Sequence, residues 1–385
     1  MKDLPLRGLR VGVFLEDGVN EVECHYNRLR LKEGGAEVVV IGNNKLDYTG
    51  ELFESLSADT KIDDVNSIDF DGVIIPGGLA PEKLRLNPKV VNFVRDIYDR
   101  GKVCAAICHG QQVFISAGML KGKRAVAAWS MVDDLVYSGA KHVSDARAVR
   151  DGNIVTGRFI HDLPEFYSLV LKAFSEIEHC DLPEKYGSRL DGKKFGILAD
   201  DAAYDMHIFY TRGRIQEESG EVIIMGRKEG TVVHLGNDTW EWGDHGYTIK
   251  VDRSLLNKGA VDSHDFPYED ELRAIKPSEI DGLIIPGGLA TWMVRGHPGL
   301  KDLIKEMDSS GKHITTIGRG PKILLSAGIL GGRVVTCHPK MRDDLVAAGI
   351  KCMDEPVVVD KNILSCRCTE DLPEWGKTFM EVMGN

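Results

Sequence analysis

The sequence lacks the features of several protein classes. Its 385 residues carry a net charge of −11, with 48 lysines and arginines against 59 aspartates and glutamates. This acidic excess disfavours a nucleic acid or an anionic membrane as a partner. No apolar run approaches the roughly 18 residues that a membrane-spanning helix needs. The first 18 residues have charges on both sides of a short apolar stretch, so we expect no signal peptide and a cytoplasmic protein.

Patterned cysteines are also missing. The eight cysteines form neither a CxxC pair nor the ligand spacing of a zinc site. Several lie in apolar, strand-like runs, which is typical of reduced, buried thiols in a cytosolic protein. We therefore expect neither a structural metal nor a cofactor. The cysteines are Cys24, Cys104, Cys108, Cys180, Cys337, Cys352, Cys366 and Cys368.

What the chain does contain is an internal repeat. DFDGVIIPGGLAPEKLR (69–85) returns as EIDGLIIPGGLATWMVR (279–295), with an offset of 210 residues. MVDDLVYSGAK (131–141) returns as MRDDLVAAGIK (341–351) with the same offset. A period this long indicates duplication of a whole domain rather than a solenoid.

The two copies begin with a different offset. RVGVFLEDG (10–18) matches KFGILADDA (194–202), an offset of 184 instead of 210, so the second copy carries 26 extra residues before its PGG turn. A chain of this length suits two domains of ordinary size. We place the first domain at 1–178, a polar linker with proline and glycine at 179–191, and the second domain at 192–385.

Each copy alternates strand-like and helix-like segments. In the first copy, the apolar strands 9–15 and 36–42 flank a helix over 20–35 that ends on two glycines. This alternation, with continuous apolar strands, predicts an α/β fold in which helices cover both faces of a mostly parallel sheet. Ligands of such sheets bind at the carboxyl ends of the strands, where Cys108 and the PGG turns lie.

The stretch AAICHGQQ (105–112) places a cysteine and a histidine between a buried strand and a helix. This order is that of a nucleophile elbow, a strained turn, although the serine-hydrolase GxSxG pattern is absent. We expect the following helix to lower the pKa of the Cys108 thiol. His109 is a candidate acid or base. The backbone N–H groups of Gly77, Gly78 and His109 are candidate oxyanion donors.

The second copy reads TTIGRGPK (315–322) at this place, with Gly318 for the cysteine and Arg319 for the histidine. Glycine costs little at a strained turn, so this copy is expected to keep the fold and to lack the chemistry. The alternative for the first copy is a small buried cysteine beside a surface histidine, and spacing alone does not decide between the two interpretations.

These segments resemble the ThiJ/PfpI superfamily, which includes the parkinsonism-associated deglycase. The resemblance covers nearly all of the first copy, and AICHGxxxxxxAGxLKG is a specific signature. The second copy matches in DGLIIPGGLA, SAGILGGR, DDLVAAGIK and DLPEW, and the tandem arrangement resembles the two-domain plant glyoxalases of this family. The resemblance implies flavodoxin-like domains of the class I glutamine amidotransferase type. It also implies a homo-oligomer, here a dimer or trimer of tandem chains.

The resemblance also implies roles for two glutamates. In the family, a glutamate on the first helix hydrogen-bonds the nucleophilic thiol, and Glu23 occupies that place. A carboxyl group beside a thiolate is pushed to stay protonated and can then donate a hydrogen bond. The alternative is a capping box between Asn20 and Glu23. Glu82 fits a glutamate that reaches the Cys-His pair of a neighbouring subunit, and its alternative is a solvated charge near a helix start.

The sequence departs from the family pattern in places. Many PfpI relatives have two adjacent acids early on the first helix, where this chain has Asn20 and Glu21. We expect no second cysteine site, because the second copy changes all four site residues, to His207, Trp292, Gly318 and Arg319. The inserted segment 234–254 carries His234 and His245, and we interpret it as a polar hairpin or flap rather than a metal site.

Three functions follow as hypotheses. The first is a cofactor-free glyoxalase or deglycase for small reactive carbonyls, in which Cys108 forms a hemithioacetal with methylglyoxal, the substrate that the resemblance implies. The second is a cysteine hydrolase of amides or peptides, with an acyl group on Cys108. The third is a redox-sensing stress protein in which Cys108 is oxidised to sulfinate. A stable acyl adduct would favour the second, and oxidation without turnover the third.

Overall fold

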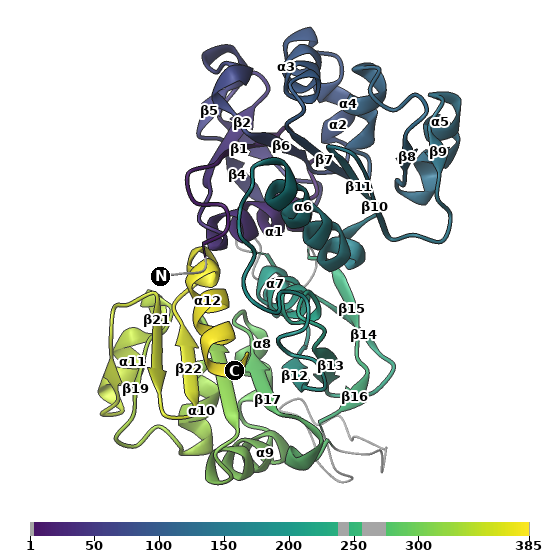
Figure 1. Cartoon of the computed structure of the whole chain (residues 1–385). Coiled ribbons are helices and arrows are strands. Elements are labelled where there is room, and N and C mark those ends of the chain that lie inside the picture. The colour runs from purple at the N-terminus through teal and green to yellow at the C-terminus, as the bar shows by residue number, and fades with distance from the viewer. Residues whose placement is uncertain (1–3, 238–245, 256–274, 385) are drawn as a thin grey trace. The chain divides into compact units, whose positions relative to one another are not determined.

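The computed structural model describes residues 4–237, 246–255 and 275–384. The chain separates into two compact units, Met1–Gly187 and Ser188–Asn385, and each unit holds one seven-stranded sheet (Figure 1). The division falls inside the segment that we interpret as a linker. No helix of the described residues is long and apolar enough to cross a membrane.

The first unit is built on a mostly parallel sheet with the strand order β10-β11-β7-β6-β1-β2-β5. The edge pair β10–β11 is antiparallel, and the other neighbours are parallel. The strands are β1 Arg10–Leu15, β2 Glu37–Gly42, β5 Thr60–Lys61, β6 Gly72–Ile75, β7 Val103–Ile107, β10 Ala148–Asp151 and β11 Ile154–Gly157. Every residue of β6, β7 and β11 is buried, because helices cover both faces of the sheet.

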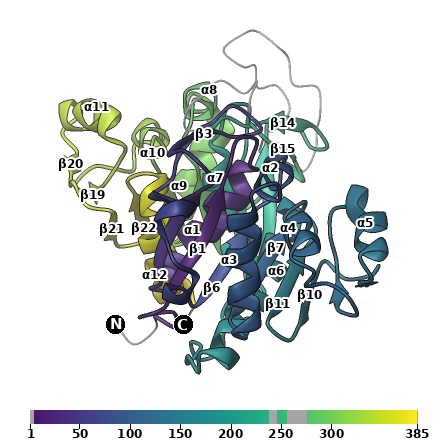
Figure 2. The same cartoon turned by 90° about the horizontal axis from the view of Figure 1, so that it is seen from above.

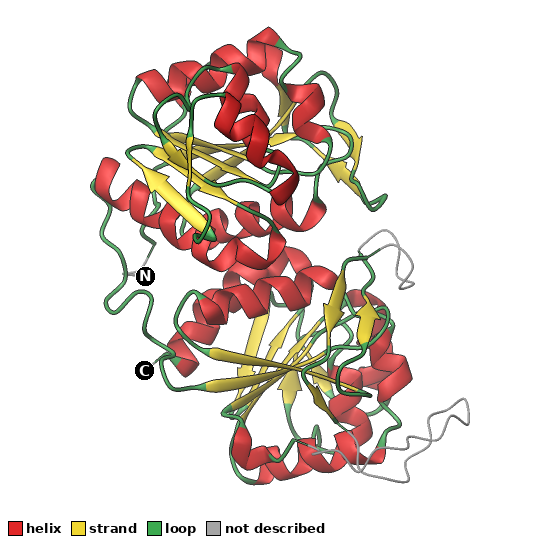
Figure 3. Ribbon diagram, turned by 90° about the vertical axis from the view of Figure 1, so that its right-hand side faces the viewer, coloured by secondary structure: helices red, strands yellow, loops and turns green. Residues whose placement is uncertain are grey.

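Helices lie on both sides of this sheet (Figures 1 and 3). One side carries α1 Glu21–Glu33 and α6 Leu163–Ile177, and the other carries α2 Ala80–Leu84, α3 Pro88–Asp99 and α4 Gln111–Ser116. A small subdomain lies outside the edge strand β10 and is made of β8 Arg124–Ala125, α5 Val132–Tyr137 and β9 Lys141–His142 (Figure 2). A hairpin of β3 Asp47–Thr49 and β4 Ser55–Ser57 follows β2. The 3₁₀ turns are η1 Ile62–Asp64, η2 Ser67–Asp69, η3 Trp129–Met131 and η4 Ile160–Asp162.

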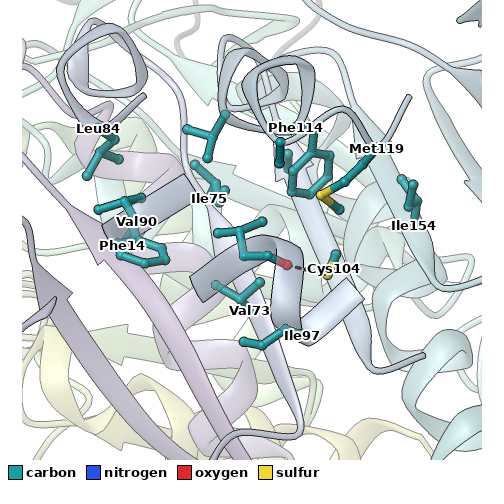
Figure 4. Packing of buried hydrophobic residues seen from close by; sticks show 14 of the residues in the cluster. Phe14, Val73, Ile75, Leu84, Val90, Ile97, Cys104, Phe114, Met119 and Ile154 are labelled. Atoms are coloured by element: carbon teal, nitrogen blue, oxygen red, sulfur yellow. Dashed lines mark hydrogen bonds between the residues drawn. The ribbon is translucent and has the colours of Figure 1, made fainter. Parts of the chain in front are cut away.

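The core on the α3 and α4 side is apolar and includes one thiol. Figure 4 shows Phe14, Val73, Ile97, Phe114 and Cys104 as members of this cluster. Cys104 lies on β7, four positions before Cys108, which follows the end of that strand. Burial raises the pKa of the Cys104 thiol. Cys104 is therefore a core residue, as expected for most of the cysteines, and the strand it occupies fixes the position of Cys108 above it.

The second unit repeats this plan with the strand order β16-β13-β12-β17-β18-β22-β21. Its strands are β12 Lys194–Leu198, β13 Glu221–Gly226, β16 Arg253–Ser254, β17 Gly282–Ile285, β18 His313–Ile317, β21 Val357–Asp360 and β22 Ile363–Cys366. Its helices are α7 Asp205–Gln216, α8 Ala290–Val294, α9 Pro298–Ser309, α10 Pro321–Ala327, α11 Arg342–Ala347 and α12 Leu372–Met383. Its remaining elements are β19 Val334–Val335, β20 Lys351–Cys352, η5 Pro277–Glu279, η6 Pro339–Met341 and η7 Thr369–Asp371. Tandem flavodoxin-like α/β domains are therefore confirmed.

The inserted segment 234–254 begins at the end of one hairpin arm and contains the other. Val232–His234 (β14) and Thr248–Lys250 (β15) pair antiparallel, where the first unit has the shorter β3–β4 hairpin. His245 and the other residues at 238–245 lie outside the described residues. Within the described part of the chain, no group of three or more His, Cys, Asp or Glu side chains is arranged to hold a metal ion.

Candidate functional site

Cys108 lies at the turn between β7 and α4 with a left-handed backbone. Its φ angle is +63°, a region in which a residue other than glycine is strained. Two hydrogen bonds hold the turn, from Cys108 N to Gly157 O at 3.1 Å and from Ala128 N to Cys108 O at 3.2 Å. The backbone of a nucleophile elbow, expected from the strand–turn–helix order, is therefore confirmed.

The side chains of Cys108 and Glu23 meet at Gly77. Glu23 comes from α1, and its Oε2 accepts a hydrogen bond from Gly77 N at 2.7 Å. A Cβ atom on Gly77 would lie 2.4 Å from Cys108 Cβ, 2.9 Å from Cys108 Sγ and 2.7 Å from Glu23 Oε2. Only glycine leaves room for both side chains here. Because the Gly77 N–H is engaged by Glu23, the N–H groups of Gly78 and His109 stay as the candidate oxyanion donors of this turn.

Burial controls protonation at this pair. Glu23 is fully buried, and desolvation raises the pKa of its carboxyl group to about 8, against the hydrogen bond from Gly77. Glu23 is therefore mostly protonated at neutral pH. Burial, followed by charge on Glu23, also raises the pKa of the Cys108 thiol, while the N–H groups of Gly78 and His109 act in the opposite direction.

The expected lowering of the Cys108 pKa is therefore wrong. The helix that follows the elbow has only six residues, and the loss of water around the sulfur outweighs the N–H groups that face it. A protonated Glu23 carboxyl group carries no charge to oppose a thiolate, so in this form Glu23 does not add to the penalty. The two groups act as a coupled pair, in which the proton on Glu23 favours ionisation of Cys108.

His109 is held at both ring nitrogens. Its Nδ1 lies 3.7 Å from Cys108 Sγ, and its Nε2 lies 3.0 Å from Ser130 Oγ on η3. The ring therefore lies beside the sulfur in a fixed orientation, as a general acid or base requires. Sequence reasoning missed Ser130, because no local pattern joins a serine to a histidine 21 positions before it.

Glu82 lies apart from this pair. It is exposed on the five-residue helix α2, which follows the PGG turn. Within residues 4–237, no hydrogen bond or ion pair joins Glu82 to Cys108 or His109. Its action on a neighbouring subunit stays a prediction.

Glu51 is an acidic side chain of the site that sequence reasoning also missed. It lies in the turn between β3 and β4, where its backbone N–H donates to Val19 O at 2.9 Å. Its Oε1 accepts a hydrogen bond from Asn20 Nδ2 at 2.7 Å. Its Oε2 lies 2.9 Å from the position that a Cβ atom on Gly78 would take, so the carboxylate faces the PGG turn.

Asn20 connects Glu51 to the start of α1. Its Oδ1 accepts a hydrogen bond from Glu23 N at 2.9 Å and caps the helix, while its Nδ2 holds Glu51. The capping interpretation is thus right for the backbone of Glu23, and the Glu23 carboxyl group points into the site instead of closing a capping box. Burial is the largest cause of the raised pKa of Glu23 and of Cys108, and the negative charge on Glu51 raises both further.

The second unit keeps the elbow without the sulfur. Gly318 has a φ angle of +61°. Hydrogen bonds from Gly318 N to Cys366 O and from His338 N to Gly318 O, both 2.9 Å, repeat those around Cys108. The prediction that glycine preserves the turn is therefore confirmed.

His207 takes the place of Glu23 in the second unit. Its Nδ1 accepts from Gly287 N at 2.9 Å, and its Nε2 lies 3.2 Å from Thr369 Oγ1. Burial lowers the pKa of His207 to about 3, so the ring is neutral. The Arg319 guanidinium lies 5.2 Å from the centre of the Trp292 ring, so the residues that replace His109 and Glu82 contact each other.

Comparison with known proteins agrees with this architecture. The DJ-1/PfpI family matches residues 9–173 and 193–382, which spans both units. Protein DJ-1 homolog D of Arabidopsis thaliana is 28% identical over 333 residues, covering 84% of this chain and 80% of its own. A deglycase of Pyrococcus abyssi is 39% identical over 155 residues, covering 40% of this chain and 93% of its own.

Among solved structures, a two-domain protein of Anabaena variabilis with DJ-1/ThiJ/PfpI-like and ferritin-like domains is 35% identical. The match covers 46% of this chain and 50% of that chain, with a TM-score of 0.43. The family match extends over most of both units, and the first unit carries the elbow cysteine with its buried glutamate. The chain therefore belongs to the DJ-1/PfpI family.

Proposed function

We propose that the chain is a cofactor-independent cysteine enzyme of the glyoxalase or deglycase type, acting on small reactive carbonyls such as methylglyoxal. The observation that carries this proposal is the meeting of the Cys108 and Glu23 side chains at Gly77, with His109 beside the sulfur. This arrangement offers a nucleophile and two proton carriers, which a rearrangement between neighbouring carbons needs. Relatives named deglycases support the same class.

In the first step, the Cys108 sulfur adds to the aldehyde carbon of methylglyoxal. A carbon–sulfur bond forms, and the aldehyde oxygen takes up a proton to give a hemithioacetal. The N–H groups of Gly78 and His109, which face the sulfur, would stabilise the negative charge that develops on that oxygen. The neutral Glu23 carboxyl group would leave the thiolate unopposed and could donate the proton.

In the second step, a proton leaves the former aldehyde carbon and returns to the neighbouring carbon, while the hydroxyl proton of the hemithioacetal is lost and the ketone oxygen gains a proton. His109 is the proposed carrier, since its ring lies 3.7 Å from the sulfur and is oriented by Ser130. The product is a lactate thioester on Cys108, and water cleaves it to release lactate and the thiol. The net reaction is methylglyoxal plus water to lactate. An amine adduct of the carbonyl in place of the free aldehyde would give deglycase activity.

Product analysis tests this proposal. The purified wild-type chain is incubated with methylglyoxal, a glycated amine and a set of small amides. We expect lactate to appear in a one-to-one ratio with methylglyoxal consumed. Amide cleavage with an acyl adduct on Cys108 and no lactate would assign a hydrolase instead. Oxidation of Cys108 by peroxide, with no turnover of any substrate, would assign a redox sensor.

Glu51 is expected to set the ionisation of the site through its charge. In Glu51→Gln, loss of that charge lowers the pKa of Glu23 and Cys108, so the pH at which Cys108 becomes reactive falls. Alkylation of Cys108 by iodoacetamide near pH 6, where Glu23 keeps its proton in both proteins, should be roughly two- to tenfold faster than in the wild type. The reaction is followed as a function of pH by mass spectrometry.

Glu54→Gln is the matched control for Glu51→Gln. Glu54 lies on the same hairpin, but its carboxylate pairs with His25 Nε2 at 2.9 Å. In this variant, the rate of Cys108 alkylation should depend on pH as it does in the wild type. An unchanged pH profile in Glu51→Gln would show that Glu51 does not set the ionisation of Cys108, whatever the substrate of the enzyme.

A homo-oligomer of whole chains is part of the proposal. Trp292 cannot supply a carboxylate, so a Glu82 that acts between subunits has to come from the first unit of another chain. The dimer or trimer of tandem chains stays a prediction, as does the cytoplasmic location.

A further inference from the structure

Two cysteines of the second unit lie in sulfur–sulfur contact. Cys337 Sγ and Cys352 Sγ are 3.4 Å apart, and the residues are 15 positions apart in the sequence. Cys352 ends β20, which pairs parallel with β19, and Cys337 follows β19 by two residues. The short ladder between the two strands therefore brings the thiols together and holds them there.

The fold does not require these thiols. The first unit builds the same ladder from β8 and β9, where Ala125 pairs with His142 as Val335 pairs with Cys352. At the repeat offset of 210 residues, Cys337 corresponds to Ala127 and Cys352 to His142. The second unit thus carries a pair of thiols that the first unit lacks, and the proposed reaction does not use them.

The two thiols differ in exposure. Cys337 is completely buried, whereas Cys352 is partly exposed. Burial, followed by the neighbouring Cys352 sulfur, raises the pKa of the Cys337 thiol to about 12, although Arg342 and Lys322 oppose the shift. Cys337 is therefore a protonated thiol that solvent does not reach, and Cys352 is the sulfur that an oxidant meets first.

We propose that Cys337 and Cys352 are a reversible disulfide site, oxidised by hydrogen peroxide or a small organic peroxide. Cys352 loses its thiol proton and attacks one peroxide oxygen, and the O–O bond breaks. The leaving oxygen takes up that proton, so the products are a sulfenic acid and water, or an alcohol from an organic peroxide. The Cys337 sulfur then attacks the sulfenic sulfur, loses its proton and displaces the hydroxyl group as a second water. Two thiols are oxidised to one disulfide, and one peroxide is reduced by two electrons.

The disulfide site is connected to the Gly318 turn, which keeps the elbow backbone without a cysteine. His338, which directly follows Cys337, donates its N–H to Gly318 O at 2.9 Å. A disulfide would therefore tie β20 to the segment that holds the Gly318 turn. Among the described residues, no second thiol contacts Cys108, whose sulfur faces His109, Glu23 and Gly77. We therefore expect the same oxidant to act differently on the two units.

The test oxidises the full, reduced chain with a graded series of hydrogen peroxide concentrations. Free thiols are then blocked, and the chain is digested without reductant and mapped by mass spectrometry. We expect a cross-linked peptide that joins Cys337 to Cys352, two hydrogens lighter than the reduced peptides, which dithiothreitol restores. Cys337→Ala introduces the residue that the first unit has at this position, Ala127. In this variant the cross-link is lost and Cys352 proceeds to sulfinic acid.

Cys368→Ser is the control, because it removes another partly exposed thiol of this unit and should keep the cross-link. Mapping of the wild type needs no variant, so a folding defect in Cys337→Ala leaves the test intact. Conversion of wild-type Cys352 to sulfinic acid, or its persistence as a free thiol while Cys108 is oxidised, without any cross-linked peptide, would overturn the proposal.

Discussion

Replacement of Cys108 with alanine is expected to lower kcat/KM for methylglyoxal by about 10³-fold or more. The variant removes the sulfur that forms the covalent intermediate, and no other described residue at the elbow can replace it. It keeps the Cβ atom, so the strained backbone at φ +63° is the same as in the wild type. Lactate formation is measured together with the unfolding midpoint, which should change little.

Two further variants make this result specific. Cys180→Ala removes a partly buried thiol near the boundary of the units and should keep wild-type activity. Cys108→Gly copies Gly318 and should be as inactive as Cys108→Ala, with an unfolding free energy higher by about 1 kcal/mol because glycine relieves the strained φ. Wild-type lactate formation by either Cys108 variant would rule out a covalent mechanism through this sulfur.

The duplicated α/β fold could be predicted because its signals are local and occur twice. Apolar runs such as 36–42 predict buried strands, and the PGG turns mark the ends of two more. The elbow could be predicted for a different reason. A cysteine in one copy and a glycine in the other, at the same turn, indicate a backbone that glycine tolerates, and the φ angles of +63° and +61° agree.

The pKa shifts of the site could not be predicted from the sequence, because they depend on contacts between distant segments. Glu51 is 31 positions after Asn20, and only the folded hairpin brings its carboxylate to the PGG turn. The direction of the Cys108 shift was missed for a related reason. Sequence shows a helix after the cysteine, but not how completely the sulfur and Glu23 lose their water.

Glu23→Gln is expected to lower the rate of lactate formation by about 10²- to 10⁴-fold, because glutamine cannot move a proton. The amide keeps an oxygen for the hydrogen bond from Gly77 N, which binds Glu23 Oε2 at 2.7 Å. The Cys108 side chain and the helix cap at Asn20 are left in place, so the loss reports on the carboxyl group itself.

The same variant should change how stability depends on pH. Burial raises the pKa of Glu23 to about 8, from an ordinary value of 4.5. The folded state therefore favours the protonated form, and its contribution to stability is complete below pH 4.5 and is lost as the pH rises to 8. The loss is at most about 5 kcal/mol in the free energy of unfolding. Glu23→Gln lacks this loss, so it should gain stability relative to the wild type between pH 5 and pH 8.

Denaturant unfolding at a series of pH values measures this difference. Glu82→Gln is the control, since Glu82 is exposed and its removal should leave the pH dependence parallel to that of the wild type. Parallel curves for Glu23→Gln and the wild type would mean that Glu23 is ionised in the folded protein at neutral pH. The carboxyl group would then oppose a thiolate on Cys108 instead of donating a proton to it, and the proposed first step would fail even if Cys108 is the nucleophile.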